Sequence, residues 1–139
     1  MNIHNDIRKE VLSLLENNLE GISRYSNGVP RIADLDADLP LVAVFIDDAN
    51  ADQSVIGYQE WHAGLNIVSY LPFEVGEAGL DALSEKIYNL ILKHAFENLS
   101  IKFARSYDYD FDTTSNVWIS SAIAFDITYK FEQINNFEE

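Results

Sequence analysis

Carboxylates and aromatic rings alternate at residues 106–112, SYDYDFD, and these side chains are the best candidates for a functional site. Side chains two residues apart share one face of a strand, so the two kinds separate: Asp108, Asp110 and Asp112 on one face, and Tyr107, Tyr109 and Phe111 on the other. Carboxylate oxygens are the ligands that hard divalent cations prefer. However, alternate residues of a strand lie about 6.5–7 Å apart, too far for three of them to share one ion unaided. We therefore expect an acidic face directed at solvent or at a neighbouring subunit, and no metal site.

The other residue patterns that carry chemistry are missing from the sequence. The three histidines, His4, His62 and His94, lie far apart and form no HExxH spacing, so zinc hydrolysis has no support. No G-x-S-x-G elbow, P-loop or G-x-G-x-x-G motif occurs, and no cysteine is available as a nucleophile or metal ligand. We predict that the protein is not an enzyme and needs no cofactor.

The composition is that of an acidic chain that folds as one domain, residues 1–139. A chain of 139 residues can build a single core, and its 47% hydrophobic and 12% aromatic residues argue against disorder. The net charge of −14 repels phosphate groups and the basic residues are scattered, so we expect no nucleic acid partner. No apolar run approaches the roughly 20 residues of a membrane span, so no membrane partner is expected either. The lack of cysteine suits a reducing compartment, and the cytoplasm is the expected location.

Hydrophobic periodicity predicts the elements that must position these residues. Apolar residues recur at helical spacing from residue 3 to about 19 and from 80 to about 96, which predicts two amphipathic helices. An unbroken apolar run at residues 41–46 is typical of a buried strand, and residues 58–71 alternate as a second strand. The acidic segment and residues 117–131 form a hairpin across a four-residue turn. We expect an α+β fold: a mixed or antiparallel sheet of about four main strands with two helices packed against it.

The remaining segments are interpreted as connections. Residues 25–30 carry an Asn-Gly turn signal, residues 31–39 form an acidic connection, and residues 50–57 form a polar loop. Residues 130–139 are expected to form an extended or flexible tail. Within the sheet, we expect Trp61 and Phe45 to anchor the core, and Trp118 to pack in the core or at an interface.

A series of short motifs follows one order along nearly the whole chain: Asn27-Gly28-Val29-Pro30, PLVAVF at residues 40–45, WHAGLNI at 61–67, YLP at 70–72, LDA at 80–82, IY at 87–88, YDY at 107–109, WISS at 118–121 and ITY at 127–129. In this order the chain resembles the tail terminator proteins, also called minor tail protein U, of lambda-like long-tailed phages. The first motif stands in the place of that family's D-G-x-P turn. The ordered set is far more specific than any one of its pieces.

The resemblance implies a structural role in the virion. Similar proteins form a six-fold ring that caps the completed tail tube, halts its polymerisation and presents a surface for joining the head. The implied partners are further copies of this chain, the tail tube protein and a head-side connector protein. The implied place is the head-proximal end of the tail, reached by assembly in the host cytoplasm. No cofactor is implied, although divalent cations would aid ring formation by screening charge.

A ring needs a head-to-tail interface that closes on itself, and sheet edges with exposed aromatic residues are suitable material for it. The candidate interface residues are the three carboxylates and three tyrosines of the strands: Asp108, Asp110, Asp112, Tyr58, Tyr70 and Tyr107.

Two other classes of protein remain open on the sequence alone. A small acidic inhibitor or immunity-type protein, such as a DNA mimic, would use its carboxylates to occupy a basic site. A metal-dependent enzyme would use Asp108 and Asp110. Oligomeric state separates the first of these from a terminator, because a mimic can act as a monomer or dimer whereas a terminator must close a ring.

Overall fold

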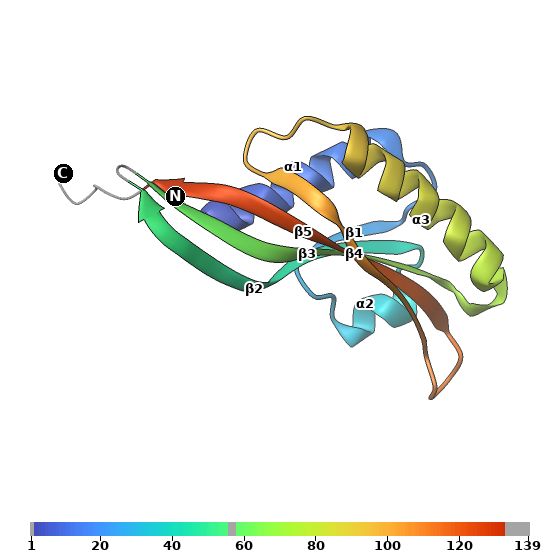
Figure 1. Ribbon diagram of the computed structural model, residues 1–139. Coiled ribbons are helices and arrows are strands. Elements are labelled where there is room, and N and C mark those ends of the chain that lie inside the picture. The colour runs from blue at the N-terminus through green and yellow to red at the C-terminus, as the bar shows by residue number, and fades with distance from the viewer. Residues whose placement is uncertain (1, 56–57, 133–139) are drawn as a thin grey trace.

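A five-stranded sheet, with its strands in the order β1-β2-β3-β5-β4, forms the centre of the computed structural model, which describes residues 2–55 and 58–132 (Figure 1). The elements follow the chain as α1 (Ile3–Asn18), β1 (Arg24–Asn27), α2 (Ile32–Ala37), β2 (Leu41–Val55), β3 (Tyr58–Pro72), a 3-10 turn η1 (Phe73–Val75), α3 (Gly76–Lys93), β4 (Ser100–Phe111) and β5 (Trp118–Glu132). Strand β1 is parallel to β2, and the other neighbours are antiparallel. The predicted α+β class is confirmed, and β1 adds a strand to the predicted four.

Helices α1 and α3 cover one face of the sheet, and α2 lies against the other (Figure 1). The main core forms between the sheet and helices α1 and α3, where Ile7, Ile87 and Phe125 are fully buried. Apolar residues of both helices recur at the spacing of a helical stripe, so each helix buries one side only. Burial of these stripes holds the two helices against the sheet. The strand order makes β1 and β4 the two edges of the sheet.

The segment at residues 31–39 was expected to be a connection, but it contains the short helix α2. Leu35 is buried against Leu41 and Ala43 of β2, so the helix covers the face of the sheet that α1 and α3 leave open. Six residues with two aspartates give little helical periodicity, and the tertiary contact of Leu35 decides the structure.

Two other boundaries differ from the sequence interpretation. Residues 24–27 are a strand rather than the start of a turn, because they pair with residues 41–44 of β2. Residues 50–55 continue β2 rather than form a loop. Helix α1 has Asn2 as its N-cap, and the Asn2 side chain accepts a hydrogen bond from the Asn5 amide. Phe45, expected in the core, is half-buried on the α2 side of the sheet, whereas Trp61 packs against the main core while remaining half-buried.

The predicted β4–β5 hairpin is present, with a connection at residues 112–117 that includes the expected residues 113–116, and it projects past the body of the molecule at one end (Figure 1). Strand β4 begins earlier than the acidic segment, at Ser100, and among the described residues it pairs only with β5. Strand β5 continues through Glu132, so the first residues of the predicted tail extend the sheet, and residues 133–139 lie outside the described residues.

Candidate protein interface

The aromatic face of the acidic segment lies on the same side of the sheet as α3. Tyr107 and Tyr109 each donate a hydrogen bond from the phenol hydroxyl to Oδ1 of Asp81 on this helix, over 2.7 and 2.6 Å. The two rings contact each other edge to face, with centroids 5.1 Å apart. The hydrogen bonds from Tyr109 and Tyr107 lower the pKa of Asp81, because they stabilise the charged carboxylate. Strand β4 is thus attached to α3 through one carboxylate that remains exposed to solvent.

The aromatic side chains of the acidic segment are not part of the buried core. Tyr107, Tyr109 and Phe111 are 40%, 46% and 50% exposed. A groove of about 560 Å³ lies between α3 and β4. It is lined by Asp81, Ser84, Glu85, Tyr88, Ala104, Arg105, Ser106, Tyr107, Tyr109 and Ile123. Exposed rings beside an unpaired strand edge are the composition expected of a protein interface.

The three aspartates of the predicted acidic row have different surroundings. Asp112 follows the last residue of β4, and its carboxylate accepts backbone N–H bonds from Thr114, Ser115 and Val117. The bond from Val117 is the main reason that the pKa of Asp112 is lowered. Asp112 therefore stabilises the hairpin turn, which leaves Asp108 and Asp110 as the exposed carboxylates of the strand itself.

Asp110 has a neighbour across the sheet that the sequence did not indicate. Asp110 pairs with Ser120 of β5, and Ser120 pairs with Tyr70 of β3, so the three residues form one row on the α2 side. Burial and the charge of Asp110 raise the pKa of Tyr70. Tyr70 is half-buried against Trp118, with ring centroids 5.4 Å apart, rather than freely exposed. The side chain of Tyr58 lies outside the described residues, and the interface role of Tyr58, Tyr70, Tyr107 and the acidic row stays a prediction.

A second charged cluster lies on the α2 side, over Gly64 in the middle of β3. Arg105 on β4 forms an ion pair with Asp126 of β5 at 2.8 Å. A Cβ atom on Gly64 would clash with the carboxylate of Asp47 and lie 2.9 Å from the guanidinium of Arg105. Glycine therefore leaves room for both side chains above the sheet. The signal in the sequence was a glycine inside an alternating strand, which often marks a close approach.

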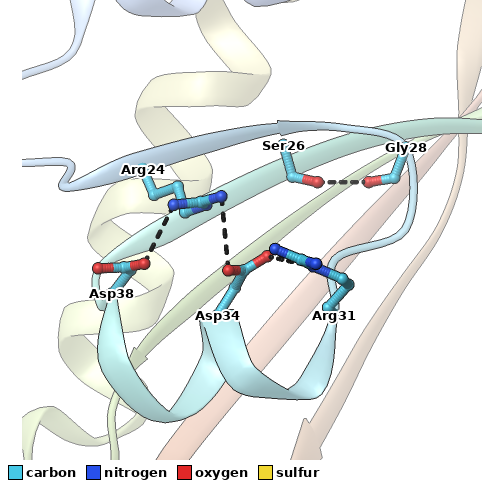
Figure 2. Close-up of polar contacts among 6 residues, drawn as sticks. All are labelled: Arg24, Ser26, Gly28, Arg31, Asp34 and Asp38. Carbon is cyan, nitrogen blue, oxygen red and sulfur yellow. Dashed lines mark hydrogen bonds and ion pairs between the residues drawn. The ribbon is translucent and has the colours of Figure 1, made fainter.

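The turn that follows β1 is held by its own polar contacts, as Figure 2 shows. The Ser26 hydroxyl donates to the carbonyl of Gly28 over 2.8 Å, and the Gly28 amide donates to the carbonyl of Val44 over 2.8 Å. Gly28 has a φ of 109°, a conformation that glycine adopts readily. The predicted Asn-Gly turn signal is thus correct, one residue beyond the end of the strand.

Beside this turn, two arginines and two aspartates form ion pairs between β1 and α2 (Figure 2). Arg24 lies 3.4 Å from Asp34 and 3.1 Å from Asp38. Arg31 reaches Asp34 only at 3.8 Å, and its side chain is 80% exposed. The guanidinium of Arg31 therefore remains accessible to a further partner.

Neither a metal centre nor a membrane segment is found in the part of the chain that the structure describes. Among residues 2–55 and 58–132, no three His, Asp or Glu side chains are grouped so that they could hold a metal ion. No described helix is both long enough and apolar enough to cross a bilayer.

Comparisons with known proteins identify the family to which the chain belongs. The family model described as phage minor tail protein U matches residues 2–129. The chain belongs to this family, and the predicted resemblance is confirmed. The family is one of structural components of phage tails, not of enzymes, as predicted.

Two curated relatives extend the comparison. The chain is 31% identical over 130 residues to the tail tube terminator protein of Escherichia phage lambda, covering 91% of this chain and 98% of the relative. It is 30% identical over 129 residues to the tail tube terminator protein of Escherichia phage N15, covering 91% and 97%.

Proposed function

We propose that this protein is a tail tube terminator, which ends the growth of a phage tail tube. The observation that carries this proposal is the match to two curated tail tube terminators over nearly their entire length. The match covers 98% and 97% of the two relatives, so the proposal rests on similarity to each whole relative and not to one part of it.

A closed ring of six copies is the assembly proposed for this task. A ring of identical subunits uses two different surfaces of each subunit, one contacting the next copy and one the previous copy. The sheet supports such an arrangement because its two edges differ: β1 is short and parallel to its neighbour, and β4 is long and antiparallel. One face of the ring would bind the last layer of tail tube protein, and the other a head-side connector protein.

Charge opposes the closure of this ring. Each subunit carries a net charge of −14, so six copies bring about −84 together. We expect a monomer or weak oligomer in dilute solution, and rings at high concentration or on a tube end. Salt and divalent cations should favour the ring without acting as cofactors, since they screen charges beyond about 8–10 Å.

The experiment that tests the function is tail production in a host that expresses all tail proteins except this one. Without the terminator, tubes should continue to polymerise, so electron microscopy should show overlong tails that do not join heads. Supplying the protein from a plasmid should restore one tail length. Tails of normal length that join heads in its absence would contradict the proposal.

A further inference from the structure

The turn after β1 presents an apolar side chain on a rigid support. Val29 is 72% exposed, although the neighbouring backbone is fixed by the hydrogen bonds of Ser26 and Gly28 described above. Pro30 follows and restricts the backbone further. Because the turn is ordered before any partner arrives, docking it would cost little conformational entropy.

The α3–β4 groove offers the complementary surface. Its walls carry the exposed rings of Tyr88, Tyr107 and Tyr109, and its helical rim carries Asp81 and Glu85, one turn apart. The basic residue in its lining, Arg105, is already paired with Asp126. The groove is therefore an aromatic surface with unneutralised carboxylates along one side.

The charges of the turn and of the groove match. Arg31 stands two residues after Val29 and is the most exposed partner of the ion pairs around the turn, at 80%. An apolar tip followed by a cation fits an aromatic groove bordered by two carboxylates. Arginine also packs well over tyrosine rings.

The position of the two surfaces decides which partner can bring them together. Strands β1 and β4 are opposite edges of one sheet, so the turn cannot reach the groove of its own subunit. The turn and the groove nevertheless lie along one row of paired residues that crosses the sheet. Asn27 pairs with Val44, Val44 with Ile67, Ile67 with Ile123, and Ile123 with Tyr107 in the groove. Copies related by rotation alone, as in a closed ring, can therefore bring one copy's turn to the next copy's groove.

We infer that residues 28–31 of one subunit dock into the α3–β4 groove of the next, with Val29 against the tyrosine rings and Arg31 beside Asp81 and Glu85. This contact rests on the ring proposed above and assigns its two surfaces. It is a head-to-tail contact, so every subunit supplies one turn and one groove.

The test uses charge reversal on each side, in Arg31→Glu and Glu85→Lys. Each variant places like charges at every contact of its own ring, so ring formation should require at least about tenfold more protein than the parent. Lys93→Glu is the matched control, because Lys93 is exposed on α3 and lies outside the groove. Thermal melting should establish that all three variants fold as the parent does.

The decisive step is to mix the two variants in equal amounts. In an alternating ring of six, the glutamate introduced at position 31 would face the lysine introduced at position 85 at one contact, and Arg31 would face Glu85 at the next. Sedimentation at a parent ring-forming concentration should therefore detect rings in the mixture but not in either variant alone. Val29→Ser removes the apolar tip of the turn, so introducing it into the parent, or into both charge variants before they are mixed, should weaken ring formation.

Each other result has a distinct meaning. If the parent and both variants form rings equally well, the ring stands and the assigned contact is wrong. If both variants fail and mixing does not restore rings, the assigned contact is also wrong. If the parent forms no ring under any condition, tube ends included, the ring and its contact are both overturned.

Discussion

The hydroxyl of Tyr109 donates to Oδ1 of Asp81 over 2.6 Å, and this contact connects the free edge strand of the sheet to helix α3. It raises the pKa of Tyr109 above its ordinary value, because the carboxylate accepts the phenol proton's hydrogen bond. Tyr107 makes a parallel contact to the same oxygen. One carboxylate on the helix thus fixes two neighbouring aromatic residues of β4.

Replacing Asp81 with Ala should loosen the outer half of β4 without unfolding the protein. The variant removes the acceptor of both tyrosine hydroxyls, while the core below is untouched. Backbone amides of residues 107–111 should exchange with solvent severalfold faster, and those of β3 should be unchanged. The matched control is Glu77→Ala, at an exposed carboxylate in the first turn of the same helix. Unchanged exchange in β4 would mean that the two hydrogen bonds do not hold the strand.

The same contact should make stability depend on pH in the acid range. The pKa of Asp81 is lowered in the folded protein, chiefly by Tyr109 and Tyr107. A lowered folded pKa contributes stability above the ordinary carboxyl pKa, and this contribution is lost as the pH falls through the folded value. The melting temperature of the parent should therefore exceed that of Asp81→Ala at neutral pH, and the difference should close in strong acid. A difference that is constant with pH would assign the effect of the mutation to something other than the charge.

Two aspartates of the acidic segment should respond differently to substitution. Asp112→Ala removes the acceptor of three backbone amides in the hairpin turn, so it should lower the melting temperature by several degrees. Asp108→Ala removes an exposed carboxylate of β4 and should leave the melting temperature nearly unchanged. Thermal unfolding followed by circular dichroism would measure both. Equal effects would indicate that the turn does not depend on Asp112.

Hydrophobic periodicity in the sequence was sufficient to predict the helices and strands that bury one apolar face. Helices α1 and α3 and strands β2, β3 and β5 carry stripes or alternating residues, and the hairpin follows from its turn residues. Helix α2 and strand β1 were missed because each is short and exists through a tertiary contact: Leu35 on the sheet, and residues 24–27 beside β2. Local patterns do not contain such contacts.

The candidate site was predictable in part. Alternation correctly placed Tyr107 and Tyr109 on the face opposite Asp108 and Asp110, because β4 is regular after residue 106. It did not reveal that Asp81, on a helix 26 residues away along the chain, accepts both tyrosine hydroxyls. That contact depends on where α3 crosses the sheet, which is set by the packing of its buried face.

Core and surface phenylalanines should differ sharply in their contribution to stability. Phe125 is fully buried and stacks against Tyr88, so Phe125→Ala should lower the free energy of unfolding by about 3–5 kcal/mol. Phe103, on the edge strand, is 54% exposed, and Phe103→Ala should change it by no more than about 0.5 kcal/mol. Urea denaturation of both variants would measure the difference. A small loss for Phe125→Ala would place this residue outside the core.

Tube growth in solution tests the central claim most directly. Tail tubes are incubated with purified terminator, washed, and then supplied with an excess of tail tube protein, and tube lengths are measured by electron microscopy over time. If this protein is a terminator, treated tubes should keep their length while untreated tubes grow. Treated tubes that lengthen at the same rate as untreated ones would contradict the claim.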